Sequence, residues 1–160
     1  MPNPVKPVPE RYHSLTPNLV CQNANAAIDF YKRVFGATEI ERFAGPKGEV
    51  MHAELKIGDS VIFVNDAMGK LAPVPGQGVT NPTYLHLYAP DVDVIFNRAV
   101  SAGARVDMPV QDMFWGDRYG KITDPFGQQW GIATHKEDVA REDLPRRQQE
   151  FFAKAAAGRR

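Results

Sequence analysis

The residues with the clearest chemical potential are a histidine between two tyrosines, in the segment Tyr84-Leu-His-Leu-Tyr88. Side chains alternate between the two faces of a strand, so we expect the histidine and both tyrosines to share one face. Histidine titrates near neutral pH and serves as a general base or a hydrogen-bonding group. His86 is therefore a candidate catalytic or ligand-binding residue. A histidine satisfied by a neighbour inside a cavity would give the same pattern.

A second candidate is the segment Trp115-Gly-Asp-Arg-Tyr-Gly120, which combines an aromatic ring, a fixed positive charge and a phenol. Arginine holds carboxylate or phosphate groups in a bidentate manner. The alternative is structural, with Arg118 paired to Asp117 or Asp124 and the tryptophan packed in the core. The candidate ligand-binding residues of this segment are Trp115, Arg118 and Tyr119.

Metal and nucleophile chemistry have weaker support. His52 and Glu54 alternate along one segment and, with His86, would offer three donors to a metal ion, but their spacing matches no recognised motif. The single cysteine, Cys21, falls on the packed side of its strand, which favours an inert buried thiol. The sequence contains no Gly-rich phosphate loop, Ser-His-Asp arrangement or CxxC pair.

The composition limits the class of protein. The chain has 160 residues, of which 43% are apolar, enough to fill a core. Its 19 basic and 19 acidic side chains balance, which argues against a nucleic-acid partner. No apolar run is long enough to span a membrane, and residues 1–13 form a proline-rich extended arm without a signal core. We therefore expect a cytoplasmic protein with neither a nucleic-acid nor a membrane partner.

The elements that must position these residues occur twice. A short strand, an amphipathic helix and a helix-ending glycine recur, so that Gly36 matches Gly103 at an offset of 67 residues. Gly58 and Gly127, each before a later strand, repeat the pattern at an offset of 69 residues. Such repeats indicate two copies of one unit. We predict an α+β fold of two βαβββ modules with pseudo-twofold symmetry, plus a C-terminal helix.

The modules are predicted to span residues 14–66 and 83–137, joined by a linker over 67–82 that is rich in proline and glycine. The predicted strands are 14–21, 38–44, 49–57, 60–65, 83–89, 104–111, 117–123 and 128–134. Helices are predicted at 24–35, at 91–102 and within 138–160. The last one has an apolar side formed by Leu144, Phe151 and Phe152.

Facial alternation separates a helix-packed face of each sheet from a concave face suited to a ligand. In the strand at 60–65 we assign Val61 and Phe63 to the helix side and Ile62 to the concave face. The residues of the other strands that fall on the concave face include Asn18, Tyr84 and His86.

Several segments carry a family resemblance: residues 7–17, 27–37, 52–60, 115–120, 124–127 and 132–138. Together they resemble the PhnB-like branch of the vicinal oxygen chelate superfamily, which includes glyoxalase I, bleomycin- and fosfomycin-resistance proteins and extradiol dioxygenases. The resemblance covers roughly residues 7–140 and implies the glyoxalase/bleomycin resistance-like fold. It does not name a reaction, because one scaffold of this kind supports many chemistries.

The resemblance also bears on metal binding. Enzymes of the superfamily hold a divalent metal with one residue from each of strands one, four, five and eight, usually His, Gln or Glu. The matching positions here are Thr16, Ile62, Tyr84 and Gly131. Two of them offer no side-chain donor, and hydroxyl groups are poor ligands at neutral pH. We therefore expect no metal at this position and no cofactor.

The resulting hypothesis is a small-molecule-binding protein whose ligand is anionic or aromatic. Its predicted site consists of Asn18, Tyr84, His86, Trp115, Arg118 and Tyr119. One alternative is a metal-independent isomerase or lyase with His86 as general base and Arg118 stabilising negative charge. The other is a dimeric interaction protein without a ligand. We expect a homodimer, because superfamily cavities are commonly completed across a twofold axis and such dimers are the most frequent oligomers.

Overall fold

The computed structural model describes residues 6–68 and 83–158. The chain divides into two compact units, residues 1–80 and 81–160, each with its own sheet. Within the described ranges, no helix combines the length and the apolar character needed to cross a membrane. Most of the predicted linker at 67–82 and the first part of the predicted arm lie outside the described residues.

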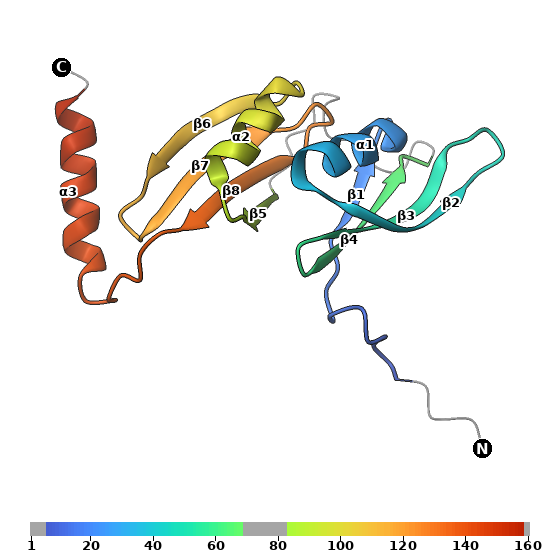
Figure 1. The fold of residues 1–160 in the computed structure, drawn as a ribbon, viewed down its shortest axis with the longest axis horizontal. Coiled ribbons are helices and arrows are strands. Elements are labelled where there is room, and N and C mark those ends of the chain that lie inside the picture. Colours follow the sequence, from blue (N-terminus) through green and yellow to red (C-terminus); the bar gives the residue numbers. More distant parts are fainter. Residues whose placement is uncertain (1–5, 69–82, 159–160) are drawn as a thin grey trace. The chain divides into compact units, whose positions relative to one another are not determined.

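The first unit is a four-stranded sheet with one helix packed against it (Figure 1). Its elements are β1 (Asn18–Cys21), α1 (Ala24–Phe35), β2 (Thr38–Ala44), β3 (Val50–Ile57) and β4 (Ser60–Asp66). The strand order is β1-β4-β3-β2, with β1 parallel to β4 and the other neighbours antiparallel. The helix contacts β1, β3 and β4 and so covers one face of the sheet.

Local sequence sets both ends of α1. The side-chain oxygen of Asn23 accepts a hydrogen bond from the backbone N–H of Ala26 at 3.0 Å, which caps the first turn. Gly36 ends the helix at a φ of 67°, a left-handed conformation that glycine adopts without strain. The buried side of the helix is formed by Ala27, Ile28, Tyr31 and Val34.

The second unit repeats this arrangement and adds a C-terminal helix (Figure 1). Its elements are β5 (Tyr84–Tyr88), α2 (Val92–Ser101), β6 (Arg105–Asp112), β7 (Asp117–Thr123), β8 (Gln129–His135) and α3 (Leu144–Ala157). The strand order is β5-β8-β7-β6, with β5 parallel to β8. Asp91 caps α2 by accepting a hydrogen bond from the N–H of Val94 at 3.1 Å. On α3, Phe151 and Phe152 contact the ring of Phe114.

The prediction of two βαβββ modules and a C-terminal helix is confirmed, because both sheets have the same strand order with a helix after the first strand. The first helix has its predicted bounds, and every strand after β1 agrees with its prediction within one residue at each end. β1 is shorter than predicted and begins at Asn18. Pro17, just before it, has no N–H to extend the ladder, although its carbonyl accepts a hydrogen bond from Phe63 at 2.8 Å.

The facial assignment of β4 was wrong. Ile62 is 5% exposed and belongs to the core beneath α1, whereas the ring of Phe63 lies on the opposite face of the sheet, which we call the open face. There it contacts Tyr12 and His52 at centroid distances of 5.7 and 4.8 Å. The run Val61-Ile-Phe-Val64 is apolar at every position, so its alternation carries no polar signal that would separate the two faces.

Candidate functional site

The open face of the second sheet, opposite α2, carries a row of aromatic and basic side chains. The strand register places His86 of β5, Gly131 of β8 and Lys121 of β7 side by side. Gly120 faces the other way, because a Cβ on it would lie 2.7 Å from the ring of Phe96 in α2. We define the aromatic face as Tyr84, His86, Tyr88, Tyr119 and Lys121.

A stacked pair forms the centre of the aromatic face. The imidazole of His86 lies over the phenol ring of Tyr119, with centroids 5.4 Å apart and planes only 6° from parallel. Tyr119 is buried while His86 is exposed, so the outer ring presents its surface to solvent. The inner ring fits because position 131 is a glycine, where a Cβ would stand 2.8 Å from the Tyr119 hydroxyl oxygen. Burial, followed by the neighbouring Tyr84, raises the pKa of Tyr119 and keeps the phenol neutral.

The positive charge on this face comes from Lys121. Its ammonium nitrogen stands 4.4 Å from the centroid of the Tyr84 ring, a cation–π contact with a half-exposed tyrosine. Sequence reasoning missed Lys121, although alternation along β7 would have found it, because residues 117, 119 and 121 share one face.

Arg118 lies on the opposite face of β7, toward α2. Its Nε and Nη2 donate to the two carboxylate oxygens of Asp93 at 2.7 and 2.8 Å, and its Nη1 donates to Asp112 at 3.2 Å. The hydrogen bonds to Asp93 and then Asp112 raise the pKa of Arg118. The predicted structural partners, Asp117 and Asp124, were wrong, because the actual ones lie on other elements and no local spacing indicates them. A ligand role would require Arg118 to leave both carboxylates.

Asp117 supports one end of the aromatic face. It is 3% exposed, and its Oδ2 accepts hydrogen bonds from the Tyr88 hydroxyl at 2.9 Å and from Trp115 Nε1 at 3.0 Å. Its Oδ1 is 2.8 Å from Nδ1 of His135. Burial tends to raise the pKa of Asp117, but the hydrogen bonds from His135, Tyr88 and Trp115 more than offset this and lower it. The ionised carboxylate thus fixes Trp115 beside Tyr119, with ring centroids 5.9 Å apart.

His135, at the end of β8, is exposed but is held by two carboxylates. Nδ1 pairs with Asp117, and Nε2 lies 2.9 Å from Asp138. The hydrogen bond to Asp117 and then that to Asp138 raise the pKa of His135, so the folded state favours the imidazolium. Sequence reasoning did not anticipate this pair, because Asp117 and His135 are joined only by the antiparallel register of β7 and β8.

The structure brings together most of the predicted ligand-binding residues. Those on or beside the aromatic face are Tyr84, His86, Trp115 and Tyr119. Asn18 belongs to the first unit, where its amide donates to the side chain of Asn65 at 2.9 Å. Asn18 and Arg118 are therefore not part of the aromatic face.

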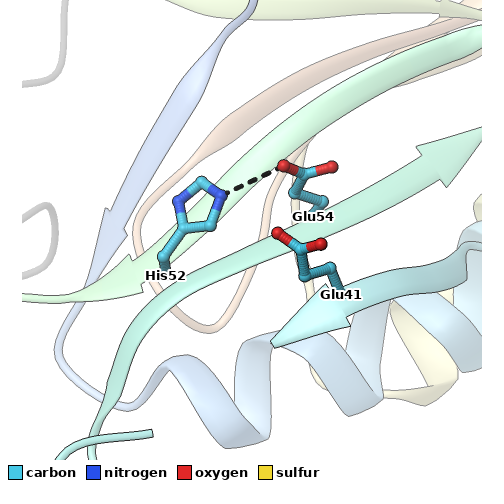
Figure 2. A group of neighbouring side chains, drawn as sticks. All are labelled: Glu41, His52 and Glu54. Atoms are coloured by element: carbon cyan, nitrogen blue, oxygen red, sulfur yellow. Dashed lines mark hydrogen bonds and ion pairs between the residues drawn. The ribbon is translucent and has the colours of Figure 1, made fainter. Parts of the chain in front are cut away.

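Two of the four positions at which the family resemblance places a metal ligand offer no side-chain donor to a divalent ion. Phe63 occupies the open-face place on β4 and has no donor atom, and Gly131 on β8 has none either. The ring of Tyr119 also covers Gly131. A different donor group lies on the first sheet, where Glu41 joins His52 and Glu54 (Figure 2). His86, the third donor suggested by the sequence, belongs to the second unit.

Comparison with known proteins finds a matching family model, similar sequences and similar solved structures. The family model of the Glyoxalase/Bleomycin resistance protein/Dioxygenase superfamily matches residues 12–132. Protein Rv0887c of Mycobacterium tuberculosis is 39% identical over 136 residues, which cover 82% of this chain and 79% of that protein. The crystal structure of TioX from Micromonospora sp. ML1 superposes with a TM-score of 0.62 at 28% identity, covering 77% of this chain and 98% of TioX. A PhnB protein from Bacillus cereus has a TM-score of 0.63 at 16% identity, covering 76% and 99% of the two chains, a likeness of fold alone.

Proposed function

The chain belongs to the Glyoxalase/Bleomycin resistance protein/Dioxygenase superfamily, and from this premise we propose that its aromatic face binds a planar, anionic small molecule. The observation that carries the proposal is the parallel stack of His86 on Tyr119. A buried ring holds an exposed ring flat, and such a ring offers a planar ligand an offset-stacked contact worth about 0.5–1.5 kcal/mol beyond its buried area.

The charge on the aromatic face favours an anionic group on the ligand. Lys121 places an ammonium beside Tyr84, and ammonium donors form strong hydrogen bonds with carboxylates and phosphates. Asp117, a buried acid on the same face of β7, already accepts hydrogen bonds from Tyr88, Trp115 and His135, so its carboxylate is engaged with these partners. A planar molecule with one negative group therefore matches both features of the face.

The two alternatives have less support. A general base is usually oriented by a second group, and within the described residues no hydrogen bond orients the ring nitrogens of His86. The general-base role of His86 stays a prediction. For the interaction protein, Phe152 of α3 is 57% exposed and offers an apolar surface to a second copy. We therefore keep the homodimer as a proposal that is compatible with ligand binding.

The test uses 2-naphthoate as the probe and its neutral amide as the comparison, with affinities measured by isothermal titration calorimetry on the full chain. Lys121→Met should weaken 2-naphthoate about tenfold or more, as expected for a charged hydrogen bond, and should change the affinity for the amide little. His86→Ala should weaken both probes, because both stack on the ring.

Arg118→Met is the matched control, since it removes a positive charge from the same strand but from the opposite face. It should lower the melting temperature through the loss of the Asp93 contact and leave both affinities unchanged. Failure of wild-type protein to bind 2-naphthoate at millimolar concentration would contradict the proposal. An equal loss of affinity in Arg118→Met and Lys121→Met would contradict the assigned face.

A further inference from the structure

Two carboxylates lie directly opposite each other on neighbouring strands of the first sheet. Glu41 of β2 and Glu54 of β3 are direct partners in the antiparallel register. Like charges directly opposite each other destabilise a strand pair. This arrangement is therefore expected where a cation lies between them.

A β-bulge brings Glu41 to this position. Glu39 pairs with Leu55, and Glu41 pairs with the next residue along β3, Glu54, so the register shifts at Ile40. Glu39 faces the helix side, where Lys32 of α1 lies 3.3 Å from its carboxylate. Without the bulge Glu41 would face the same way, because residues two apart on a regular strand share a face. The extra residue turns Glu41 to the open face.

His52 supplies a third donor on the same face. Its Nε2 lies 3.3 Å from Oε1 of Glu54. The imidazole is held between two phenyl rings, with centroids 6.1 Å from Phe43 and 4.8 Å from Phe63. Figure 2 shows the imidazole and both carboxylates gathered on one side of the two strands. Among the described residues, this is the one group of three such side chains whose donor atoms all lie within 4.8 Å of one another.

The carboxylate of Glu54 is buried and incompletely hydrogen-bonded. Glu54 is 3% exposed, and its Oε1 accepts a hydrogen bond from the Tyr12 hydroxyl at 2.5 Å. Its buried Oε2 has no hydrogen-bond donor. Burial tends to raise the pKa of Glu54, but the hydrogen bonds from Tyr12 and His52 and the charge of Arg11 more than offset this and lower it. Glu54 thus keeps one buried oxygen without a hydrogen bond, which is costly in the protein interior.

Arg11 is the nearest cation to this group. Its Nη2 donates a long hydrogen bond of 3.4 Å to Glu54 Oε1. The same nitrogen lies 3.3 Å from Glu54 Oε2 and 4.0 Å from Glu41 Oε2, and Glu54 Oε2 receives no hydrogen bond. The arginine side chain is 50% exposed and comes from the segment that precedes β1. A half-exposed guanidinium at these distances compensates the carboxylates only in part.

We propose that Glu41, His52 and Glu54 bind a divalent transition-metal ion such as Zn²⁺, which takes the place of the Arg11 guanidinium. Ligand atoms around one zinc ion stand about 3–4 Å apart, given bond lengths of about 2.0–2.2 Å. The 3.3 Å separation of His52 and Glu54 already meets this, and a small side-chain rotation brings Glu41 into range. Three protein ligands leave a fourth position open to solvent or substrate. This site lies in the first unit and does not depend on the proposed function.

The test is calorimetric titration of chelator-treated, untagged full-length protein with Zn²⁺. Wild type should bind one ion per chain, and Glu41→Gln and His52→Asn should each weaken binding tenfold or more. Glu39→Gln is the matched control, a neighbouring acid on the other face of the same strand, and should bind as wild type does. Arg11→Met should bind several times more tightly, because a competing cation is gone.

Glu41 and His52 are partly exposed, so both variants should fold, and a thermal melt checks this. Absence of binding by wild type would overturn the proposal, even if Arg11→Met binds, because Arg11 would then hold the site closed in the native protein. One-to-one binding that survives both Glu41→Gln and His52→Asn would overturn it too, by placing the ion elsewhere.

Discussion

Each sheet has a buried carboxylate on one of its central strands, Glu54 in β3 and Asp117 in β7, and both residues are 3% exposed. Asp117 receives hydrogen bonds on both oxygens, whereas Glu54 receives them on Oε1 and has no donor at Oε2. A buried carboxylate with both oxygens satisfied stabilises the fold around it. One with an unsatisfied oxygen needs another explanation, and a bound ion is one such explanation. Asp117 therefore supports the aromatic face, whereas we propose that Glu54 belongs to a cation site.

The largest effect is expected from Asp117→Asn. The new amide would present a donor to groups that are themselves donors, so the free energy of unfolding should fall by about 3 kcal/mol. Chemical denaturation measures this. Asp112→Asn is the control, because this exposed acid makes one 3.2 Å contact with Arg118, and it should change stability little. A loss below about 1 kcal/mol in Asp117→Asn would remove Asp117 from its supporting role.

Substitutions at two glycines of the second sheet distinguish a position needed for core packing from one needed for ligand binding. Gly120→Ala places a Cβ 2.7 Å from Phe96 and 2.9 Å from Val110 on the helix side, so the free energy of unfolding should fall by about 2 kcal/mol. Gly131→Ala meets the far end of the Tyr119 ring and should cost about 1 kcal/mol by displacing it. Calorimetry should then show weakened 2-naphthoate binding in Gly131→Ala alone. Unchanged affinity in that variant would mean that the His86–Tyr119 stack is not the binding surface.

Glu54→Gln should be milder than Asp117→Asn. The amide oxygen can still accept the hydrogen bond from Tyr12, and the change removes the repulsion with Glu41. The free energy of unfolding should fall by about 1 kcal/mol or less in the same denaturation experiment. A loss equal to that of Asp117→Asn would show that both carboxylates are structural and would weaken the difference between the sheets.

The smallest effect is a pH dependence centred on His135, whose ring faces Asp117 and Asp138. Its pKa is raised in the folded state, so the imidazolium stabilises the fold fully below its unfolded pKa of about 6.5. This contribution is lost as the pH rises through the higher folded pKa. The melting temperature of wild type should therefore decline over that range more than that of His135→Gln. Parallel curves for the two proteins would show that the pair does not contribute.

The element bounds could be predicted from the sequence because caps, glycines and alternation are local signals. Asn23 and Gly36 mark the ends of α1, and the glycine-ended repeat indicates two modules. The face of the sheet on which a side chain lies was harder to predict at two positions. In β4 the uniform apolar run hides which side Phe63 takes, and in β2 the bulge at Ile40 reverses the side that simple alternation gives to Glu41.

The partners of charged residues could not be predicted from local spacing. Arg118 pairs with Asp93 across the packing of β7 on α2, and His135 pairs with Asp117 across two strands. Such contacts depend on the tertiary arrangement. The aromatic residues Tyr84 and His86 were found because a short alternating strand already fixes their common face.

The most direct test of the ligand-binding face uses the four histidines of the chain as reporters. Full-length protein with ¹³C-labelled histidine gives separate ring signals for His13, His52, His86 and His135 in a two-dimensional NMR spectrum, assigned by single substitutions. On titration with 2-naphthoate we expect the largest shift at His86 and little change at His52. A largest shift at His52 or His13, or no shift at His86 at saturating probe, would contradict it.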